Sequence, residues 1–352
     1  MRSLVLYGID DLRLEDLPVP DPEPGEVVIE VTTALTCATD AKMLRLGAHP
    51  ALGPLPAPLG HELCGIVHAV GSGVSQRLLG RRVVVANSAP CETCWACAEH
   101  REDLCQARTY LVGAFAEYVR VPASIVRRNL IEVPPDMSDV LAALVEPLAC
   151  AALGARRCSA RDGDWVVVLG GGVQGQLLTS QLAARGCRVL LCDPHLERRE
   201  RALRFGAECV ADAPQSAEAI EAVRRRFPGG CGAPYVIEAV GRIEAWTSAL
   251  QVARRGAEVT FYGGCASHDV LPVPSHDLHY GQLRLQGSYH HTPQTVRIAF
   301  DALRCERTPF TELVDQRDMG LEDVFAALRA GGEKHVVRPR ANLAARSHNE
   351  SI

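Results

Sequence analysis

A glycine-rich segment near the middle of the chain limits its possible folds more than any other feature. The segment Gly170–Gly175 reads Gly-Gly-Gly-Val-Gln-Gly; it follows the apolar run Trp165–Leu169 and opens a helical pattern over Val173–Arg185. A second apolar run, Arg188–Cys192, comes next and is followed at once by Asp193. A strand, a tight glycine turn, a helix and a second strand make a βαβ unit, whose two strands lie parallel in one sheet.

The same alternation continues along the chain and predicts a doubly wound parallel sheet of the Rossmann type, in an α/β fold. We expect further strands over Tyr235–Ala239, Glu258–Tyr262 and Leu283–Gly287, and helices over Leu196–Phe205 and Ile243–Ala253.

The two ends of the chain have a different texture. Residues up to about 135 carry short apolar runs, such as Val27–Val31 and Arg82–Ala86, between turn residues, which is typical of a β-rich domain. Because 352 residues are too many for one hydrophobic core, two domains are expected. Near the C-terminus we expect helices over Pro293–Leu303 and Leu321–Leu328, a strand over Lys334–Val337 and a frayed polar tail from Ala341.

Charge and composition exclude some classes of partner. The net charge is −5 and the arginines are scattered, so no basic face for nucleic acid is expected. No signal peptide and no apolar run of about 20 residues are apparent, which argues against export and membrane insertion and favours the cytoplasm. The 14 cysteines are therefore expected to be thiols or metal ligands. Only Lys42 and Lys334 are lysines, which we interpret as composition bias without functional content.

One cysteine cluster has the spacing of a metal site. Cys91, Cys94, Cys97 and Cys105 form C-x2-C-x2-C-x7-C within a lobe at about residues 88–108. Four thiolates this close in sequence can surround one zinc tetrahedrally, whereas a disulfide pair or unrelated buried thiols are the alternatives. Four sulfur ligands leave no open position for a substrate, so the expected zinc is structural.

Three separate segments carry residues suited to a second, catalytic zinc. Cys37 with Thr39 and Asp40, His61 with Glu62, and Glu146 lie far apart in sequence. A catalytic zinc takes about three protein ligands and keeps one exchangeable position, and thiolate, imidazole and carboxylate supply these ligands. Each segment alone is weak evidence for a metal site, because a lone cysteine or histidine usually packs in the core and a glutamate before proline usually starts a helix.

The glycine-rich segment also predicts a dinucleotide site. Gly170, Gly172 and Gly175 let the backbone approach a pyrophosphate, whose charge meets the amide groups at the start of the helix, with Val173 and Gln174 in its first turn. Asp193 can accept hydrogen bonds from both ribose hydroxyls and would repel a 2′-phosphate, which favours NAD over NADP. Arg198 and Arg199 could instead meet a phosphate, or be solvated helix charges.

These motifs together resemble the zinc-containing medium-chain dehydrogenase/reductase family, and its sorbitol and threonine dehydrogenase branches in particular. The similarity spans roughly residues 1–338. It implies a GroES-like catalytic domain over 1–147, a Rossmann NAD-binding domain over 148–288, and a return to the catalytic domain with a C-terminal tail over 289–352. It also implies two zinc ions per chain and a homodimer or homotetramer.

The resemblance assigns roles to the site residues. Cys37, His61 and Glu146 would hold the catalytic zinc, and Glu62 would lie beside it and exchange with water as a ligand. Thr39 would hydrogen-bond the substrate oxygen and begin a proton relay, and Asp40 would orient a ligand. The family often has histidine where this chain has Lys42, so the outer relay departs from the pattern; His49 is the alternative relay residue and an ordinary loop histidine is the other interpretation.

The expected activity is hydride transfer between NAD and a secondary alcohol of a small polar substrate: a polyol, cyclitol or aminocyclitol. The polyol branch is favoured because Glu146 stands where other alcohol dehydrogenases have cysteine. A threonine-type amino-alcohol dehydrogenase shares every motif and is the alternative. A non-catalytic zinc- and NAD-binding protein is the alternative from a different class; the open zinc site argues against it.

Overall fold

The computed structural model describes residues 1–305 and 307–340, so the tail expected to be frayed lies outside the described residues. The chain divides into two compact units. Unit 1 contains residues 1–146, 292–304 and the described part of 310–352, and unit 2 contains residues 147–291 and 305–309. Among the described residues, no helix has the length and apolar character needed to cross a membrane.

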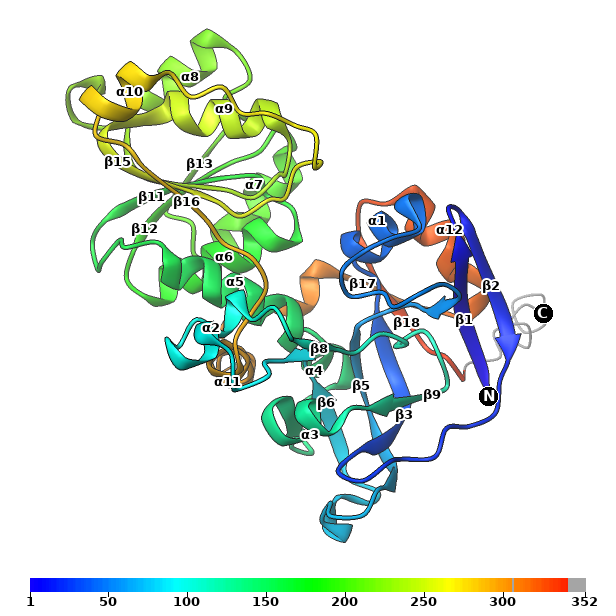
Figure 1. Ribbon diagram of the computed structural model, residues 1–352. Coiled ribbons are helices and arrows are strands. Elements are labelled where there is room, and N and C mark those ends of the chain that lie inside the picture. The colour runs from blue at the N-terminus through cyan, green and yellow to red at the C-terminus, as the bar shows by residue number, and fades with distance from the viewer. Residues whose placement is uncertain (306, 341–352) are drawn as a thin grey trace. The chain divides into compact units, whose positions relative to one another are not determined.

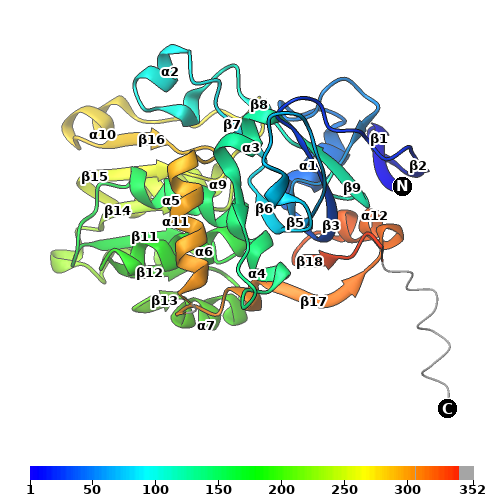
Figure 2. The same cartoon turned by 90° about the horizontal axis from the view of Figure 1, so that it is seen from below.

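Unit 2 is built on a six-stranded sheet with the order β13-β12-β11-β14-β15-β16, which Figure 2 shows edge to edge. All of its strand pairs are parallel; Val167, for example, lies opposite Leu190 on one side and Val236 on the other. The predicted parallel sheet is therefore confirmed. Its strands are β11 (Trp165–Leu169), β12 (Arg188–Cys192), β13 (Cys209–Ala211), β14 (Ala233–Glu238), β15 (Ala253–Phe261) and β16 (Arg284–Gly287).

Helices cover both faces of this sheet, as Figure 1 shows, with α8 and α9 on one face and α6 on the other. Both faces are therefore buried, which explains why β11 reads as a continuous apolar run. The helices of the unit are α5 (Val145–Arg157, whose first two residues belong to unit 1), α6 (Val173–Ala184), α7 (Leu196–Arg204), α8 (Ala217–Arg224), α9 (Ile243–Val252) and α10 (Ser275–Tyr280).

Unit 1 contains a larger sheet in the order β10-β6-β5-β3-β18-β17, with β9 also paired to β3. Two smaller sheets, β2-β1-β4 and β7-β8, complete it. The strands are β1 (Arg2–Gly8), β2 (Asp11–Asp16), β3 (Val27–Leu35), β4 (Ala57–Pro58), β5 (Glu62–Val70), β6 (Arg82–Val85), β7 (Ser88–Ala89), β8 (Thr109–Tyr110), β9 (Tyr118–Val121), β10 (Leu130–Glu132), β17 (Val314–Met319) and β18 (Lys334–Val337). The helices are α1 (Ala38–Leu46), α2 (Trp95–Ala98), α3 (Ala123–Asn129), α4 (Asp139–Ala143), α11 (Pro293–Arg304) and α12 (Leu321–Ala330).

The register of the larger sheet brings distant segments together. Leu35, at the end of β3, lies opposite Glu62 at the start of β5 and opposite Val336 of β18. The chain on either side of these positions therefore converges at one end of the sheet. Cys37 follows β3 by two residues, His61 precedes β5, and Lys334 opens β18. The strand pairing alone thus accounts for the grouping of residues separated by up to 298 positions.

Candidate active site and metal centres

Cys37 lies at the start of helix α1, which it caps. Its sulfur accepts from the Thr39 backbone N–H at 3.5 Å, and its own backbone N–H donates to Asp40 Oδ2 at 3.1 Å. This reciprocal capping satisfies amide groups that a helix start leaves without partners. It also fixes the position of the thiol relative to the helix. Thr39 is half-buried in the first turn, and Asp40 is completely buried.

His61 is buried and contacts the same aspartate. Its Nδ1 lies 2.8 Å from Asp40 Oδ1, so the carboxylate accepts from Nδ1–H and Nε2 is the nitrogen with a lone pair for a metal. Burial lowers the pKa of His61, but the charges of Asp40 and Cys37 outweigh it and raise the pKa well above its usual value. A metal ion at Nε2 would therefore displace a proton at neutral pH.

Cys37, His61 and Glu62 form one metal-sized group. Each offers a ligand atom, and these atoms all lie within 4.8 Å of one another. Glu62 is completely buried, and its Oε1 has no hydrogen-bond partner. A buried, unpaired carboxylate oxygen beside a thiol and an imidazole is the donor set that zinc accepts, so these residues fit the ion. Glu146, in the first turn of α5, is buried but does not belong to this group in the described part of the chain.

Lys334 contacts this group, although no sequence motif indicated a role for it. Its Nζ donates to Glu62 Oε2, and also to the Thr36 carbonyl oxygen at 2.9 Å. Burial lowers the pKa of Lys334, but the charges of Glu62, Cys37 and Glu146 outweigh it and raise the pKa above its usual value. The residue is therefore a buried ammonium group.

The four-cysteine lobe forms a second metal-sized group, in the same unit. The ligand atoms of Cys91, Cys94, Cys97 and Cys105 lie within 4.8 Å of one another, and all four are free thiols. Sulfur atoms around a tetrahedral zinc lie about 3.8 Å apart, given Zn–S bonds of about 2.3 Å. The Cys94–Cys97 and Cys91–Cys97 distances are 3.6 and 4.0 Å, so the lobe fits the ion.

The lobe also favours thiolate at one of its ligands. Hydrogen bonds from the backbone and hydroxyl of Thr93 lower the pKa of Cys91 to about 6, whereas burial raises the pKa of Cys97 to about 12. Cys91 is therefore ionised first at neutral pH, and the other thiols lose their protons to the metal.

The glycine-rich turn of unit 2 has the geometry of a phosphate cradle. Gly170 adopts φ +101°, a conformation that side chains disfavour, and a Cβ on Gly175 would lie 1.8 Å from the Gly170 carbonyl oxygen. A Cβ on Gly172, by contrast, would meet nothing within 4 Å. The first and third glycines thus serve packing, while the second leaves open space at the start of α6, where a pyrophosphate would approach.

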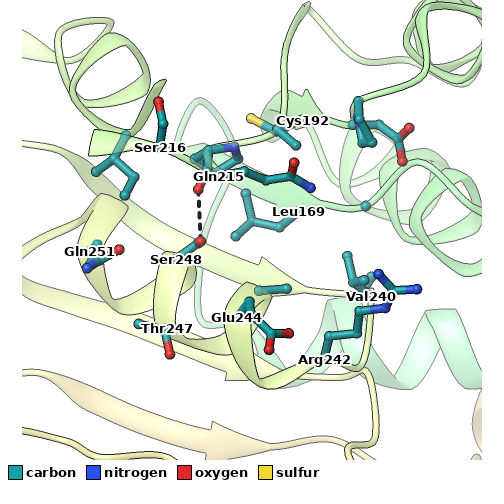
Figure 3. A pocket seen from close by; sticks show the side chains of 18 of the residues that line it. Leu169, Cys192, Gln215, Ser216, Val240, Arg242, Glu244, Thr247, Ser248 and Gln251 are labelled. Atoms are coloured by element: carbon teal, nitrogen blue, oxygen red, sulfur yellow. Dashed lines mark hydrogen bonds between the residues drawn. The ribbon is translucent and has the colours of Figure 1, made fainter. Parts of the chain in front are cut away.

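A cavity of about 980 Å³ lies at the carboxyl ends of β11, β12 and β14 (Figure 3). Gly170, Gly172, Asp193 and Arg198 line it, together with Val240 and the start of α9. In the described chain, Val173, Gln174 and Gly175 do not line it; Gln174 accepts a 2.6 Å hydrogen bond from the Tyr262 hydroxyl.

Asp193 is buried at one side of this cavity. Its two oxygens accept from the Gly171 and His195 backbone amides at 2.7 and 2.8 Å. The guanidinium of Arg198 lies 3.7 Å from the carboxylate and forms an ion pair with it. The carboxylate is therefore fixed in direction, with lone pairs to spare for further donors.

Glu238, at the end of β14, is a second buried carboxyl close to the cavity. Its Oε1 accepts from the backbone amides of Val240 and Gly241 at 2.6 and 2.8 Å. Burial raises its pKa to about 7, although these amides lower it. The residue supports the turn that carries Val240 into the cavity wall, and sequence reasoning did not identify it.

Comparisons with known proteins agree with this arrangement. The family model described as alcohol dehydrogenase GroES-like domain matches residues 23–134, and the one described as zinc-binding dehydrogenase matches residues 175–304. L-galactonate-5-dehydrogenase of Escherichia coli is 28% identical over 336 residues, which cover 91% of this chain and 95% of that protein. D-altritol 5-dehydrogenase of Agrobacterium fabrum is 30% identical over 313 residues, covering 86% and 88%. A zinc-binding dehydrogenase of Sinorhizobium meliloti, solved with NADP bound, has a TM-score of 0.86 at 28% identity, covering 96% and 99%.

A doubly wound nucleotide-binding sheet and a separate unit with thiol, imidazole and carboxylate ligands define a metal-dependent nicotinamide dehydrogenase. The chain belongs to the zinc-containing medium-chain dehydrogenase family, as the sequence resemblance predicts.

Proposed function

We propose that this dehydrogenase oxidises a secondary hydroxyl group of a small open-chain polyol or sugar acid, with NAD as the hydride acceptor. The grouping of Cys37, His61 and Glu62 carries the proposal, because it joins an ionisable thiol, an oriented imidazole and a buried carboxylate at one end of a sheet. The names of two relatives support the substrate class, since both denote oxidation at carbon 5 of a polyhydroxylated compound.

The residues of unit 1 have different roles in the proposed reaction. Cys37, His61 and Glu146 are ligands of the catalytic zinc, and Glu62 lies beside the ion and can exchange with water as a ligand. When bound, the zinc lowers the pKa of the substrate hydroxyl. Asp40 holds the His61 imidazole in direction through Nδ1, and Thr39 accepts the hydroxyl proton and passes it outward. Cys91, Cys94, Cys97 and Cys105 hold a second zinc that only stabilises their lobe, which makes two ions per chain.

The preference for NAD rests on Asp193. A carboxylate fixed in the cavity wall accepts from ribose hydroxyl groups and repels a 2′-phosphate. Arg198, whose charge would attract that phosphate, is paired with Asp193. NADP is the alternative cofactor, and one relative was solved with NADP bound. We also infer a cytoplasmic location and a homo-oligomer, and both stay predictions.

The test combines a substrate panel with one substitution. The zinc-loaded protein is assayed with NAD and with NADP over linear polyols, sugar acids, cyclitols and amino alcohols. We expect the highest kcat/KM for a linear polyol or sugar acid with NAD. In the variant Cys37→Ser, turnover should fall at least about a thousandfold and the zinc content from two to one per chain, while NADH still binds. Full activity in this variant would refute the site, and a preference for amino alcohols would refute the substrate class.

A further inference from the structure

Lys334 is an unusual residue in this chain. It is one of two lysines among 37 basic residues, and only 4% of its surface is exposed. Moving an ammonium group out of water is costly unless the group is paired and hydrogen-bonded. The contacts around Lys334 must therefore compensate for the cost of burying its charge. Composition bias, which we inferred from the sequence, does not explain why a lysine is buried at this position.

The contacts of Lys334 link two metal-ligand segments. One hydrogen bond goes to the carbonyl oxygen of Thr36, the residue before Cys37, and another goes to Oε2 of Glu62, the residue after His61. The next residue of the strand continues the link, because the His335 backbone N–H donates to Thr36 Oγ1 at 2.9 Å. A single ammonium group thus fixes the backbone beside one ligand and the carboxylate beside another.

The two oxygens of Glu62 are in different situations. Oε2 accepts from Lys334, whereas Oε1 is buried without a hydrogen-bond partner. Because a ligand atom of Glu62 lies within 4.8 Å of Cys37 and His61, the carboxylate is close enough to shift toward an ion held by those residues. Lys334 and a zinc ion would therefore attract the same carboxylate from two sides.

We propose that Lys334 is a positioning residue that holds Glu62 away from the catalytic zinc and so keeps one coordination position open for the substrate oxygen. The inference rests on the proposed function, since it takes Cys37 and His61 as ligands. Lysine suits this task better than arginine, because its compact ammonium directs single hydrogen bonds to one carboxylate oxygen and one carbonyl. An arginine fork would engage both oxygens of Glu62 and require more volume.

The first experiment measures release of the catalytic zinc to a chelator. Wild type should show a kinetic phase of zinc release that Cys37→Ser does not show. That phase reports release of the catalytic ion. In Lys334→Met, Glu62 is free to bind the metal, so this phase should slow by about tenfold while kcat falls. In the double variant Lys334→Met/Glu62→Gln, the rate should return to within about twofold of the Glu62→Gln rate. Faster release from Lys334→Met than from wild type would overturn the proposal, because a purely structural lysine predicts that result.

A control variant separates positioning from stability. Arg338 follows the same strand and donates to Thr32, Thr33 and Asp318. In the described part of the chain these contacts lie outside the segments that carry the candidate ligands. Arg338→Met should lower the thermal midpoint and leave zinc release unchanged. A slower release in Arg338→Met as well would overturn the specific role of Lys334.

A second experiment does not depend on Lys334→Met folding. Cobalt is placed in the catalytic site, and its visible d–d spectrum is compared in wild type and Glu62→Gln. Identical spectra are expected if Lys334 holds Glu62 off the metal in the resting state, and a changed spectrum would overturn the proposal. If wild type has no zinc phase that depends on Cys37, the proposed function itself fails, and this result is distinct from either outcome.

Discussion

Glu238 is a single residue that should make stability depend on pH. Burial raises its pKa to about 7 from an ordinary 4.5, so the folded protein binds this proton more tightly than the unfolded chain does. Its stabilising contribution is fully present below about pH 4.5 and is lost as pH rises through about 7. Glu238→Gln keeps an oxygen acceptor for Val240 and Gly241 but cannot ionise. Relative to this variant, the wild-type free energy of unfolding should fall by about 3 kcal/mol between pH 4.5 and 8.

Denaturant titrations at several pH values check this expectation. Glu208→Gln is the matched control, because the exposed ion pair with Arg188 lowers the pKa of Glu208 and its small effect should have the opposite sign. Parallel pH profiles for wild type and Glu238→Gln would contradict the assignment.

Residues within short motifs were predictable, whereas residues acting across the fold were not. Cys91 to Cys105 and Gly170 to Gly175 lie close in sequence, so their spacing alone indicates their chemistry. Lys334 meets Glu62 across 272 positions, and a lone lysine belongs to no motif. Glu238 likewise reads as the polar end of an apolar strand. Which glutamate completes the zinc site stays a prediction, because neither spacing nor resemblance fixes how far Glu62 lies from an ion.

At the scale of elements, the turn between β11 and α6 predicts opposite effects for two glycines. A methyl group on Gly175 would lie 1.8 Å from a backbone oxygen, so Gly175→Ala should lower the free energy of unfolding by at least about 2 kcal/mol. Gly172 has φ −66° and open space around it, so Gly172→Ala should fold normally. The added methyl group would occupy the approach of the pyrophosphate, and NADH affinity should fall about tenfold.

Thermal melting and NADH titration of both variants distinguish the two roles. An equal loss of stability in both variants would show that Gly172 also serves packing. Unchanged NADH affinity in Gly172→Ala would show that the pyrophosphate does not bind beside Gly172.

Two strands that sequence patterns missed lie at sheet edges. β11 and β12 have the predicted bounds, because strands buried on both faces are continuous apolar runs. β13 and β17 were not predicted; β13 has three half-buried residues, and β17 is the polar sequence Val-Asp-Gln-Arg-Asp-Met. Each pairs with only one neighbour in its sheet, so neither needs a full apolar face. β15 begins at Ala253, whereas the prediction began at Glu258. The earlier start was missed because Ala253 is followed by two arginines and a glycine, which do not form an apolar run.

At the scale of the whole molecule, the metal ions and the cofactor should protect different units from hydrogen exchange. The candidate zinc ligands from Cys37 to Cys105 belong to unit 1, and the cavity that includes Asp193 belongs to unit 2. Chelation should increase amide exchange at the end of β3, the start of β5 and the cysteine lobe. NADH should decrease exchange in the turns after β11, β12 and β14. Mass spectrometry after peptic digestion resolves these segments.

The variant Cys37→Ser provides the control for the exchange experiment. It should show the increase near β3 and β5 without the increase in the cysteine lobe. A uniform rise across both units on chelation would contradict the assignment of the metal sites to unit 1.

The position of β18 in the sheet has a consequence for biosynthesis. The lobe from Cys91 to Cys105 is complete early in translation, so it can take up its ion while the ribosome is still producing the rest of the chain. The other site is completed later, because β3 pairs with β18 and Glu62 meets Lys334 only after residues 334–337 have been synthesised. Until then the Ala34–Leu35 end of β3, beyond its pairing with β9, lacks its neighbour and is open to wrong pairing. Assembly of the second metal centre with Lys334 in place therefore follows the synthesis of β18.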